Sequence, residues 1–394
     1  MTIPSDKSPT ARFIPLCVPE IQGNAWAYVK ECLDTNWVSS VGSYVDRFER
    51  DLAEYVGTRY AVATVNGTSA LHTALLVAGI GPDDEVLTST LTFIAPANAI
   101  RYVGAWPVFI DADPHYWQMD PEKVVRFLDE ECVRRDGSLY NKTTHRPVKA
   151  ILPVHLLGHP VDMDPIRDAA ERYGLVIIED ATESLGATYK GRMTGTLGHM
   201  ACFSFNGNKV ITSGGGGMIV TDREDWATRA KYLTTQAKDD PIEYVHHEIG
   251  YNYRLPNLLA ALGVAQLECL DEYLRVKRRI AATYAEAFAR VPGITGMSQA
   301  EWAGSIFWMY TVLVDAERYP LNSRQLLRRL GERGIQSRPL WQPIHLSRPH
   351  RSATAYRCSV SETLFRQALS LPCSVGLSRE DQQFVCEIIA NPGG

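Results

Sequence analysis

The sequence of 394 residues predicts an α/β fold, in which a large domain with a mainly parallel sheet precedes a smaller α/β domain. Short apolar runs alternate with helical patterns over 60–181, as in a parallel sheet that helices cover on both faces. A long helical pattern over 255–291 then leads to a new strand and two helices. We therefore expect a flexible leader over 1–12, a large domain over 13–275 and a small domain over 276–394.

Each expected element follows from its pattern of apolar residues. Two helices come first, built on apolar residues at helical spacing: Ile21, Ala25, Val29 and Leu33, then Val45, Phe48, Leu52 and Tyr55. Strands are expected over 60–65, 84–89, 106–113, 149–158 and 175–181, with helices between them over 66–80, 94–104 and 162–174. The charged stretch over 130–147 is expected to be irregular. Later elements are a hairpin strand over 216–221, a broken helical region over 255–291, a strand over 307–315, and helices over 323–334 and 381–390.

Composition and charge argue against several classes of protein. The formal net charge of -5 and the pI near 6.1 leave no basic excess for neutralising nucleic-acid phosphates. No apolar stretch reaches the roughly 20 residues that a membrane helix needs. The eight cysteines are scattered without a CxxC pair, which favours buried thiols in a reducing compartment over disulfides or a zinc site. We expect a cytoplasmic globular protein that binds no metal, nucleic acid or membrane.

The ends of the expected strands are the informative places, because ligands of parallel sheets bind beyond the carboxyl ends of the strands. Gly67, Thr68 and Ser69 open a helix, where they form an anion site or where a hydroxyl simply caps the helix. Asp180 ends a strand, so its carboxylate either pairs with a cationic ring nitrogen or caps the next helix; Glu183 follows three residues later. Neither a GxGxxG block nor a Walker lysine supports a dinucleotide or P-loop site.

A single lysine, Lys209, stands shortly before four consecutive glycines, Gly214–Gly217. Such a lysine holds an anion, lies on the surface, or acts as a nucleophile that forms a Schiff base. An anion cradle, a carboxylate and an amine are the three groups that pyridoxal 5′-phosphate requires. Phe93, at another strand end, either stacks on the ring of this cofactor or is a core aromatic residue. Taken together, these residues favour a pyridoxal-phosphate site.

A series of short blocks supports the same interpretation: "TNWVSSVGSYVDRFERDLAEYVG", "NGTSAL", "TFIAPANAIRYVGAWPVFIDAD", "IEDATESLGA", "FSFNGNKVITSGGGGMIVT" and "GYNYRLPNLLAALGVAQL". In these blocks and their order, the chain resembles the DegT-type (DegT/DnrJ/StrS) sugar aminotransferases. These are pyridoxal-phosphate enzymes of fold type I that aminate nucleotide-linked keto sugars. The resemblance covers nearly the whole chain.

The resemblance implies a role for each candidate residue. Lys209 would bind the cofactor and move protons, Asp180 would pair with its pyridine nitrogen, and Glu183 would lie near its phenolic oxygen, where many members have Gln. The other cofactor contacts implied are Gly67 at the helix start, the phosphate ligands Thr68, Ser69 and Ser204, Phe93 over the ring, and Asn252 from a neighbouring subunit. His345 and Trp341, in "SRPLWQPIHL", would lie near the sugar. The active site would then require a homodimer.

The implied reaction is a ping-pong transamination from L-glutamate to the keto carbon, C-4, of a nucleotide-linked deoxy sugar. "FSFNGNK" followed by "GGGGM" resembles the branch that aminates UDP-linked 4-keto-6-deoxy-N-acetylhexosamines, on routes to legionaminic acid or bacillosamine. A GDP-4-keto-6-deoxymannose aminotransferase of the perosamine type is the second interpretation. A sugar dehydratase would need His in place of Lys209. A cofactor-binding regulator without turnover remains a further alternative.

Overall fold

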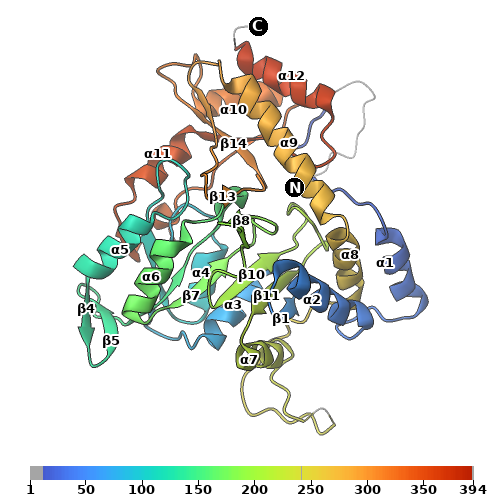
Figure 1. The fold of residues 1–394 in the computed structure, drawn as a ribbon, viewed down its shortest axis with the longest axis vertical. Coiled ribbons are helices and arrows are strands. Elements are labelled where there is room, and N and C mark those ends of the chain that lie inside the picture. Colours follow the sequence, from blue (N-terminus) through green and yellow to red (C-terminus); the bar gives the residue numbers. More distant parts are fainter. Residues whose placement is uncertain (1–11, 241, 393–394) are drawn as a thin grey trace.

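The computed structural model describes residues 12–240 and 242–392, so the expected leader lies, apart from residue 12, outside the described residues. The chain forms a broad lower part built around a large sheet and an upper part that holds α9, α10 and α12 (Figure 1). The mixed α/β architecture expected from the sequence is confirmed.

The large sheet has eight strands, and its order explains where the site lies. Across the sheet the strands are β1 (Tyr60–Thr64), β11 (Gly217–Thr221), β10 (Met200–Ser204), β7 (Val176–Asp180), β6 (Val148–Leu152), β2 (Glu85–Ser89), β3 (Trp106–Ile110) and β16 (Thr354–Tyr356). β11 runs antiparallel to both of its neighbours, whereas the other neighbouring pairs in this sheet are parallel. The carboxyl ends of β1, β2, β7 and β10 therefore meet along one edge of the sheet.

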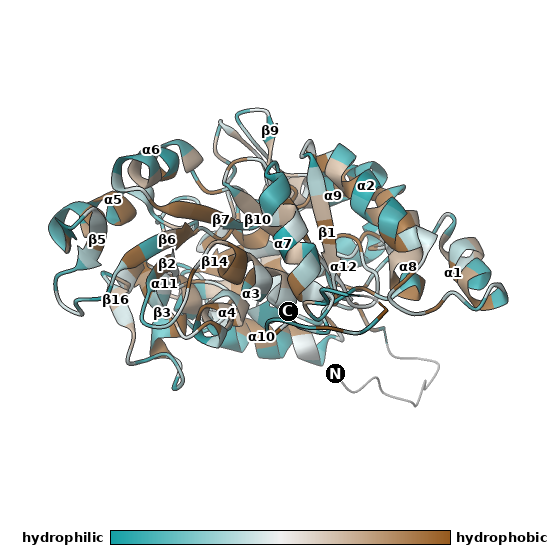
Figure 2. Ribbon diagram, turned by 90° about the horizontal axis from the view of Figure 1, so that it is seen from below, coloured by the Kyte–Doolittle hydropathy of each residue, from teal (hydrophilic) through white to brown (hydrophobic). Residues whose placement is uncertain are grey.

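Helices cover both faces of this sheet, as the buried residues show. The helices around the large sheet are α2 (Ser43–Val56), α3 (Gly67–Val77), α4 (Ala95–Tyr102), α5 (Pro121–Glu130), α6 (Met163–Tyr173) and α7 (Glu224–Thr234). Leu71 of α3, Ile100 of α4 and Ala230 of α7 pack on one face, in one apolar cluster. Phe127 of α5 and Ile166 of α6 pack on the other face. The central strands are brown in Figure 2, whereas α2 and α6 carry teal residues toward the outside.

The helical region after the sheet is broken, as its sequence predicts. α8 (Asn257–Leu267) ends just before α9 (Leu270–Phe288), and Cys269 lies between them. α8 packs against α1 (Ala25–Asp34) and α2. Val264 of α8 and Phe48 of α2 belong to the same apolar cluster as Phe203 of β10. These helices therefore cover the part of the sheet around β10, on the same face as α5 and α6.

The upper part is built around a four-stranded antiparallel sheet. Its strands, in order across the sheet, are β12 (Ile294–Gly296), β14 (Tyr310–Val314), β17 (Ala368–Leu371) and β15 (Arg338–Pro339). The helices that follow β14 in the sequence are α10 (Ser323–Glu332), α11 (Ser359–Gln367) and α12 (Arg379–Ala390). Two short 3₁₀ turns complete the chain: η1 (Leu156–Gly158) follows β6 of the large sheet, and η2 (Ile344–Leu346) follows β15. β16 returns from this part of the chain to pair with β3 of the large sheet. A domain boundary near residue 276 stays a prediction.

The charged stretch over 130–147 differs from its expected irregular structure. It forms the hairpin of β4 (Cys132–Arg135) and β5 (Ser138–Asn141), because Gly137 takes the left-handed conformation, φ +79°, that a tight turn needs. Buried and less buried residues alternate along β5, where Leu139 is buried, but both arginines of β4 are exposed. The charged residues therefore hide the strand pattern in the sequence. A further small sheet consists of β13 (Ala303–Gly304), β8 (Thr188–Tyr189) and β9 (Arg192–Met193).

Candidate active site

A pocket of about 290 Å³ opens at the carboxyl ends of β1, β2, β7 and β10. It gathers the following expected site residues: Gly67, Thr68, Phe93, Asp180, Glu183, Ser204, Lys209 and Trp341. They come from segments far apart in the sequence, which only the parallel sheet brings together. The size is at the lower end of small-molecule sites, roughly 300–1,000 Å³.

Lys209 projects into this pocket from the loop between β10 and β11. Its Nζ lies 3.8 Å from Oε1 of Glu183 and 4.2 Å from the ring centroid of Trp308. The loop is fixed just before the lysine, since the Trp308 indole N–H donates to the carbonyl of Asn208 at 2.7 Å. The amine is therefore held between a carboxylate and an aromatic face.

The glycines after Lys209 serve the backbone. Gly214 adopts φ +78°, a left-handed conformation that other residues rarely take. A Cβ on Gly217 would lie 2.5 Å from the backbone of Asn66, so only glycine lets β11 pass beneath the start of α3. None of Gly214–Gly217 lines the pocket. The glycine run thus shapes the turn behind the lysine.

Two carboxyl groups beside the lysine are buried. Asp180 ends β7, is 2% exposed, and accepts a hydrogen bond from the Thr182 N–H at 3.1 Å. Burial raises the pKa of this carboxyl group. Burial also raises the pKa of Glu183 to about 7, although the nearby Lys209 opposes the shift, and the Leu157 N–H donates to Glu183 at 2.8 Å. Glu183 therefore changes its protonation state near neutral pH.

The start of α3 offers donors to an anion. Asn66 caps this helix, because its side chain accepts from the Ser69 N–H at 2.8 Å, so neither hydroxyl serves as the N-cap. Among the described residues, the N–H groups of Gly67 and Thr68 have no hydrogen-bond acceptor. A Cβ on Gly67 would come within 2.9 Å of Ser204 Cβ, so glycine allows the helix start to approach the end of β10 closely. Two backbone donors and a hydroxyl thus converge at a positive helix end.

Aromatic rings form another side of the pocket. Phe93 is 52% exposed and lies 6.3 Å, edge to face, from Trp341. Trp341 in turn stacks on Trp308, with 6.4 Å between centroids and 7° between planes. Trp308 was absent from the candidates because "FWMYTVLVD" was expected to be a strand throughout, whereas β14 begins only at Tyr310. Other lining residues that the sequence did not single out are Asn206, Asn208 and Thr182.

Three expected site residues do not line this pocket. Ser69 is buried behind the cap of α3. His345, in η2, bonds through Nδ1 to Thr90 Oγ1 at 2.7 Å, and its Nε2 lies 3.5 Å from Glu362. Asn252 is exposed and lines a separate hollow together with Lys238, His246 and Arg254.

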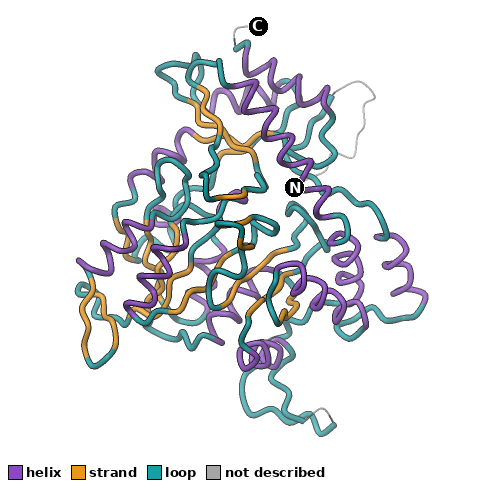
Figure 3. Tube along the Cα trace, viewed as in Figure 1, coloured by secondary structure: helices purple, strands orange, loops and turns teal. Residues whose placement is uncertain are grey.

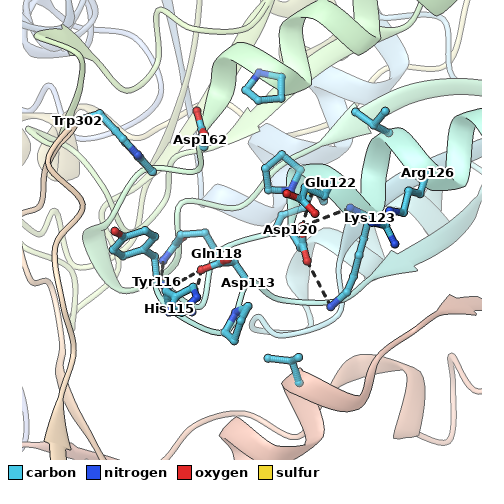
Figure 4. Close-up of a pocket in the computed structure, with 16 residues that line it drawn as sticks. Asp113, His115, Tyr116, Gln118, Asp120, Glu122, Lys123, Arg126, Asp162 and Trp302 are labelled. Carbon is cyan, nitrogen blue, oxygen red and sulfur yellow. Dashed lines mark hydrogen bonds and ion pairs between the residues drawn. The ribbon is translucent and has the colours of Figure 1, made fainter.

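A larger hollow, of about 940 Å³, lies between α5 and the chain around Tyr116 and Trp302 (Figure 4). No expected site residue lines it. Its Lys123 is already paired with Asp120 and with the buried Asp111. We therefore assign the chemistry to the smaller pocket at Lys209. Among the described residues, no group of three or more His, Cys, Asp or Glu side chains could hold a metal ion.

Pyridoxal 5′-phosphate fits the residues of this pocket. The unpaired N–H groups of Gly67 and Thr68 and the hydroxyl of Ser204 would hold its phosphate, and Asp180 its ring nitrogen. Lys209 supplies the amine for its aldehyde. The pocket thus contains the anion site, the carboxylate and the amine that the cofactor requires.

Comparisons with known proteins agree with this geometry. The sequence profile described as "DegT/DnrJ/EryC1/StrS aminotransferase family" matches residues 19–390. The chain is 40% identical over 369 residues to "GDP-perosamine synthase" of Caulobacter vibrioides, which covers 93% of this chain and 95% of that one. It is 38% identical over 378 residues to "GDP-perosamine synthase" of Escherichia coli O157:H7, covering 96% and 98%. A solved "DegT DnrJ EryC1 StrS aminotransferase" from Brucella abortus superposes with a TM-score of 0.86 at 30% identity, covering 94% and 95%.

Proposed function

Because the chain belongs to the DegT/DnrJ/EryC1/StrS aminotransferase family, we propose that it makes a GDP-linked amino sugar by transamination at C-4 of GDP-4-keto-6-deoxymannose. The family's aminotransferases use pyridoxal 5′-phosphate, and this protein is a pyridoxal-phosphate-dependent aminotransferase of sugar nucleotides. L-Glutamate is the proposed amino donor. The product would feed the synthesis of a surface polysaccharide.

The choice of GDP rests on one observation: relatives that are 40%, 38% and 34% identical to this chain are each named "GDP-perosamine synthase". The UDP-linked 4-keto-6-deoxy-N-acetylhexosamine that the motifs first suggested becomes the second candidate. It retains the support of the block "FSFNGNK" followed by "GGGGM".

The side chains of the pocket divide the work of the reaction. When bound, the cofactor supplies an electron-withdrawing ring that stabilises negative charge on a substrate carbon. Asp180, buried at the end of β7, keeps the proton on the ring nitrogen. Lys209 would carry protons to and from the reacting carbon. Glu183, whose Oε1 lies 3.8 Å from Lys209 Nζ, would accept or donate a hydrogen bond at the phenolic oxygen of the cofactor, according to its own protonation. General acid–base help of this kind contributes roughly 10²–10⁴-fold.

Other residues bind and orient. The start of α3 and Ser204 would hold the phosphate of the cofactor. Phe93 and Trp341 offer apolar faces at the open side of the pocket, suited to a deoxy sugar. His345 is proposed to reach the sugar only after it leaves Thr90, to which it is hydrogen-bonded.

The substrate is tested with purified protein, L-glutamate, and either GDP-4-keto-6-deoxymannose or the UDP-linked keto sugar. Mass spectrometry of the products, with 2-oxoglutarate measured in parallel, should show the amino sugar in the GDP reaction and an equal amount of 2-oxoglutarate. The variant Lys209→Ala controls for non-enzymatic amination. Turnover of only the UDP sugar would reverse the assignment, and turnover of neither would remove both candidates.

We also propose a homodimer with shared active sites. Asn252 is exposed and lies outside the pocket of its own chain, in the segment between α7 and α8. Part of this segment projects from the body of the molecule as a long loop (Figure 3). Ile242 and Ile249 in this loop are 80% and 82% exposed, as is expected of a segment that packs on a partner.

Complementation tests the shared site. Inactive Lys209→Ala and Asn252→Ala protomers are mixed under conditions in which labelled subunits are seen to exchange. One site of each mixed dimer would then carry both residues intact, so part of the activity should return. Exchange without any recovery would refute a site shared between the two chains.

A further inference from the structure

Two cysteines from opposite ends of the chain lie side by side beneath the lysine loop. The Cys373 N–H donates to the Leu16 carbonyl at 2.8 Å, and the Val18 N–H donates to Ser374 Oγ at 3.0 Å. These two bonds hold Cys17 beside Cys373. A disulfide requires Cα atoms about 4.4–6.8 Å apart, a spacing that adjacent, hydrogen-bonded chain segments provide.

The pair touches the residues that fix Lys209. Cys17 Sγ donates to the carbonyl of Asn208 at 3.4 Å, the same oxygen that accepts the Trp308 indole N–H. Cys373 Sγ donates to the carbonyl of Trp308 at 3.5 Å. A change at either sulfur is therefore transmitted to the backbone directly before the lysine.

A buried cation lies beside the pair. Lys277, on α9, is 3% exposed and donates to the Cys373 carbonyl at 2.6 Å, and no carboxylate forms an ion pair with it among the described residues. An unpaired buried ammonium is costly, so a nearby thiolate is favoured. The neighbouring Cys17 and the charge of Lys277 lower the pKa of Cys373. The same contact raises the pKa of Cys17, against the opposing charges of Lys277 and Lys209.

We propose that Cys17 and Cys373 form a peroxide-sensitive thiol pair whose disulfide weakens the hold on Lys209. Cys17 is partly exposed, so peroxide can reach its sulfur once the thiol has given up its proton, whereas Cys373 is 1% exposed. The Cys17 thiolate attacks hydrogen peroxide, so that an S–O bond forms, the O–O bond breaks and hydroxide leaves. The Cys373 sulfur then displaces the hydroxyl group from Cys17. An S–S bond forms as the S–O bond breaks. The two thiol protons end in two waters, and peroxide has taken the two electrons.

The disulfide removes the Cys17 thiol proton and with it the hydrogen bond to Asn208. The loop before Lys209 loses one of its two fixing contacts on that carbonyl, so turnover should fall and should recover when the bond is reduced. The other six cysteines have no cysteine partner of this kind among the described residues.

The test uses the cofactor-loaded protein. It is treated with a small excess of hydrogen peroxide, its free thiols are blocked, and it is digested without reduction. Mass spectrometry should find the peptide that joins Cys17 to Cys373, with two thiols lost per chain. Dithiothreitol should abolish the cross-link and restore turnover. Loss of thiols without this peptide would refute the pair, whatever the substrate of the enzyme proves to be.

Variants separate the pair from general oxidation. Cys17→Ser should lose both the cross-link and the reversible fall in turnover, whereas Cys386→Ser, which removes another partly exposed thiol, should behave as the wild type. Lys277→Met should slow cross-linking, because the charge that favours the thiolate is gone. Equal cross-linking rates in wild type and Lys277→Met would refute the role of Lys277. An unchanged turnover in the cross-linked wild type would refute the effect on Lys209.

Discussion

Replacing Glu183 by Gln tests the electrostatics of the pocket without altering its shape. The side chain is 4% exposed, and Gln keeps the acceptor for the Leu157 N–H. Wild-type Glu183 must lose a proton to become charged in this buried place, and the variant is neutral at every pH. The two proteins should therefore differ in how their free energy of unfolding depends on pH.

The size of the difference follows from the pKa of Glu183, which burial raises from 4.5 to about 7. The folded state binds this proton more tightly than the unfolded state does. The resulting stabilisation of the folded state is fully present below pH 4.5 and is lost as the pH rises through 7. At about 1.4 kcal/mol per pKa unit, the full loss is about 3 kcal/mol. Between pH 5 and pH 8.5 the loss is about 2.5 kcal/mol.

Urea unfolding of the cofactor-free wild type and Glu183→Gln at pH 5 and pH 8.5 measures this loss. Contributions of titrating groups that do not interact with Glu183 are common to both proteins and cancel in the difference. The free energy of unfolding of the variant should rise relative to that of the wild type by about 2.5 kcal/mol between the two pH values. A difference that stays constant within about 0.5 kcal/mol, or that changes in the opposite direction, would show that Glu183 is ionised throughout.

Four further outcomes follow from the geometry. Borohydride reduction and peptide mapping should find the pyridoxyl label on Lys209, and a label elsewhere would contradict the site. Asp180→Asn should retain cofactor, seen by absorbance, but lose turnover by about 100-fold or more, since the ring nitrogen loses its charged partner. Gly67→Ala should cost about 1–3 kcal/mol in cofactor affinity, measured by titration, because its Cβ would meet Ser204 at 2.9 Å; unaltered binding would contradict the close approach. Trp308→Leu should lower kcat by roughly 2–30-fold and Trp308→Phe less, since Phe keeps the aromatic face toward the amine.

The sequence predicted most of the elements because their apolar patterns are strong. The helical spacing of apolar residues in α1 and α2 and the apolar runs of β2 and β7 each led to an element within a few residues of its observed bounds. The strand expected over 149–158 was too long: β6 ends at Leu152, and Leu156–Gly158 form the 3₁₀ turn η1. The β4–β5 hairpin was missed, because its exposed arginines hide the alternation that marks a strand.

Site residues that follow strands directly were also accessible to sequence reasoning. Asp180 ends β7 and Thr68 lies shortly after β1, and topology alone brings such residues to one edge of the sheet. Trp308 and Asn208 were missed, because their role depends on a contact between the lysine loop and a segment about 100 residues later. No local pattern encodes such a contact. The position of Asn252 outside its own chain's pocket likewise requires the folded structure.

The pairing of β16 with β3 has a consequence for synthesis on the ribosome. Val108 of β3 lies opposite Thr354, so the edge of the large sheet stays open until nearly the whole chain has been made. Loop closure over such a separation is slow, and an unpaired parallel edge invites association with other nascent chains. We expect translation arrested before residue 354 to leave a chain that aggregates through β3, although every pocket residue up to Trp341 has already been made.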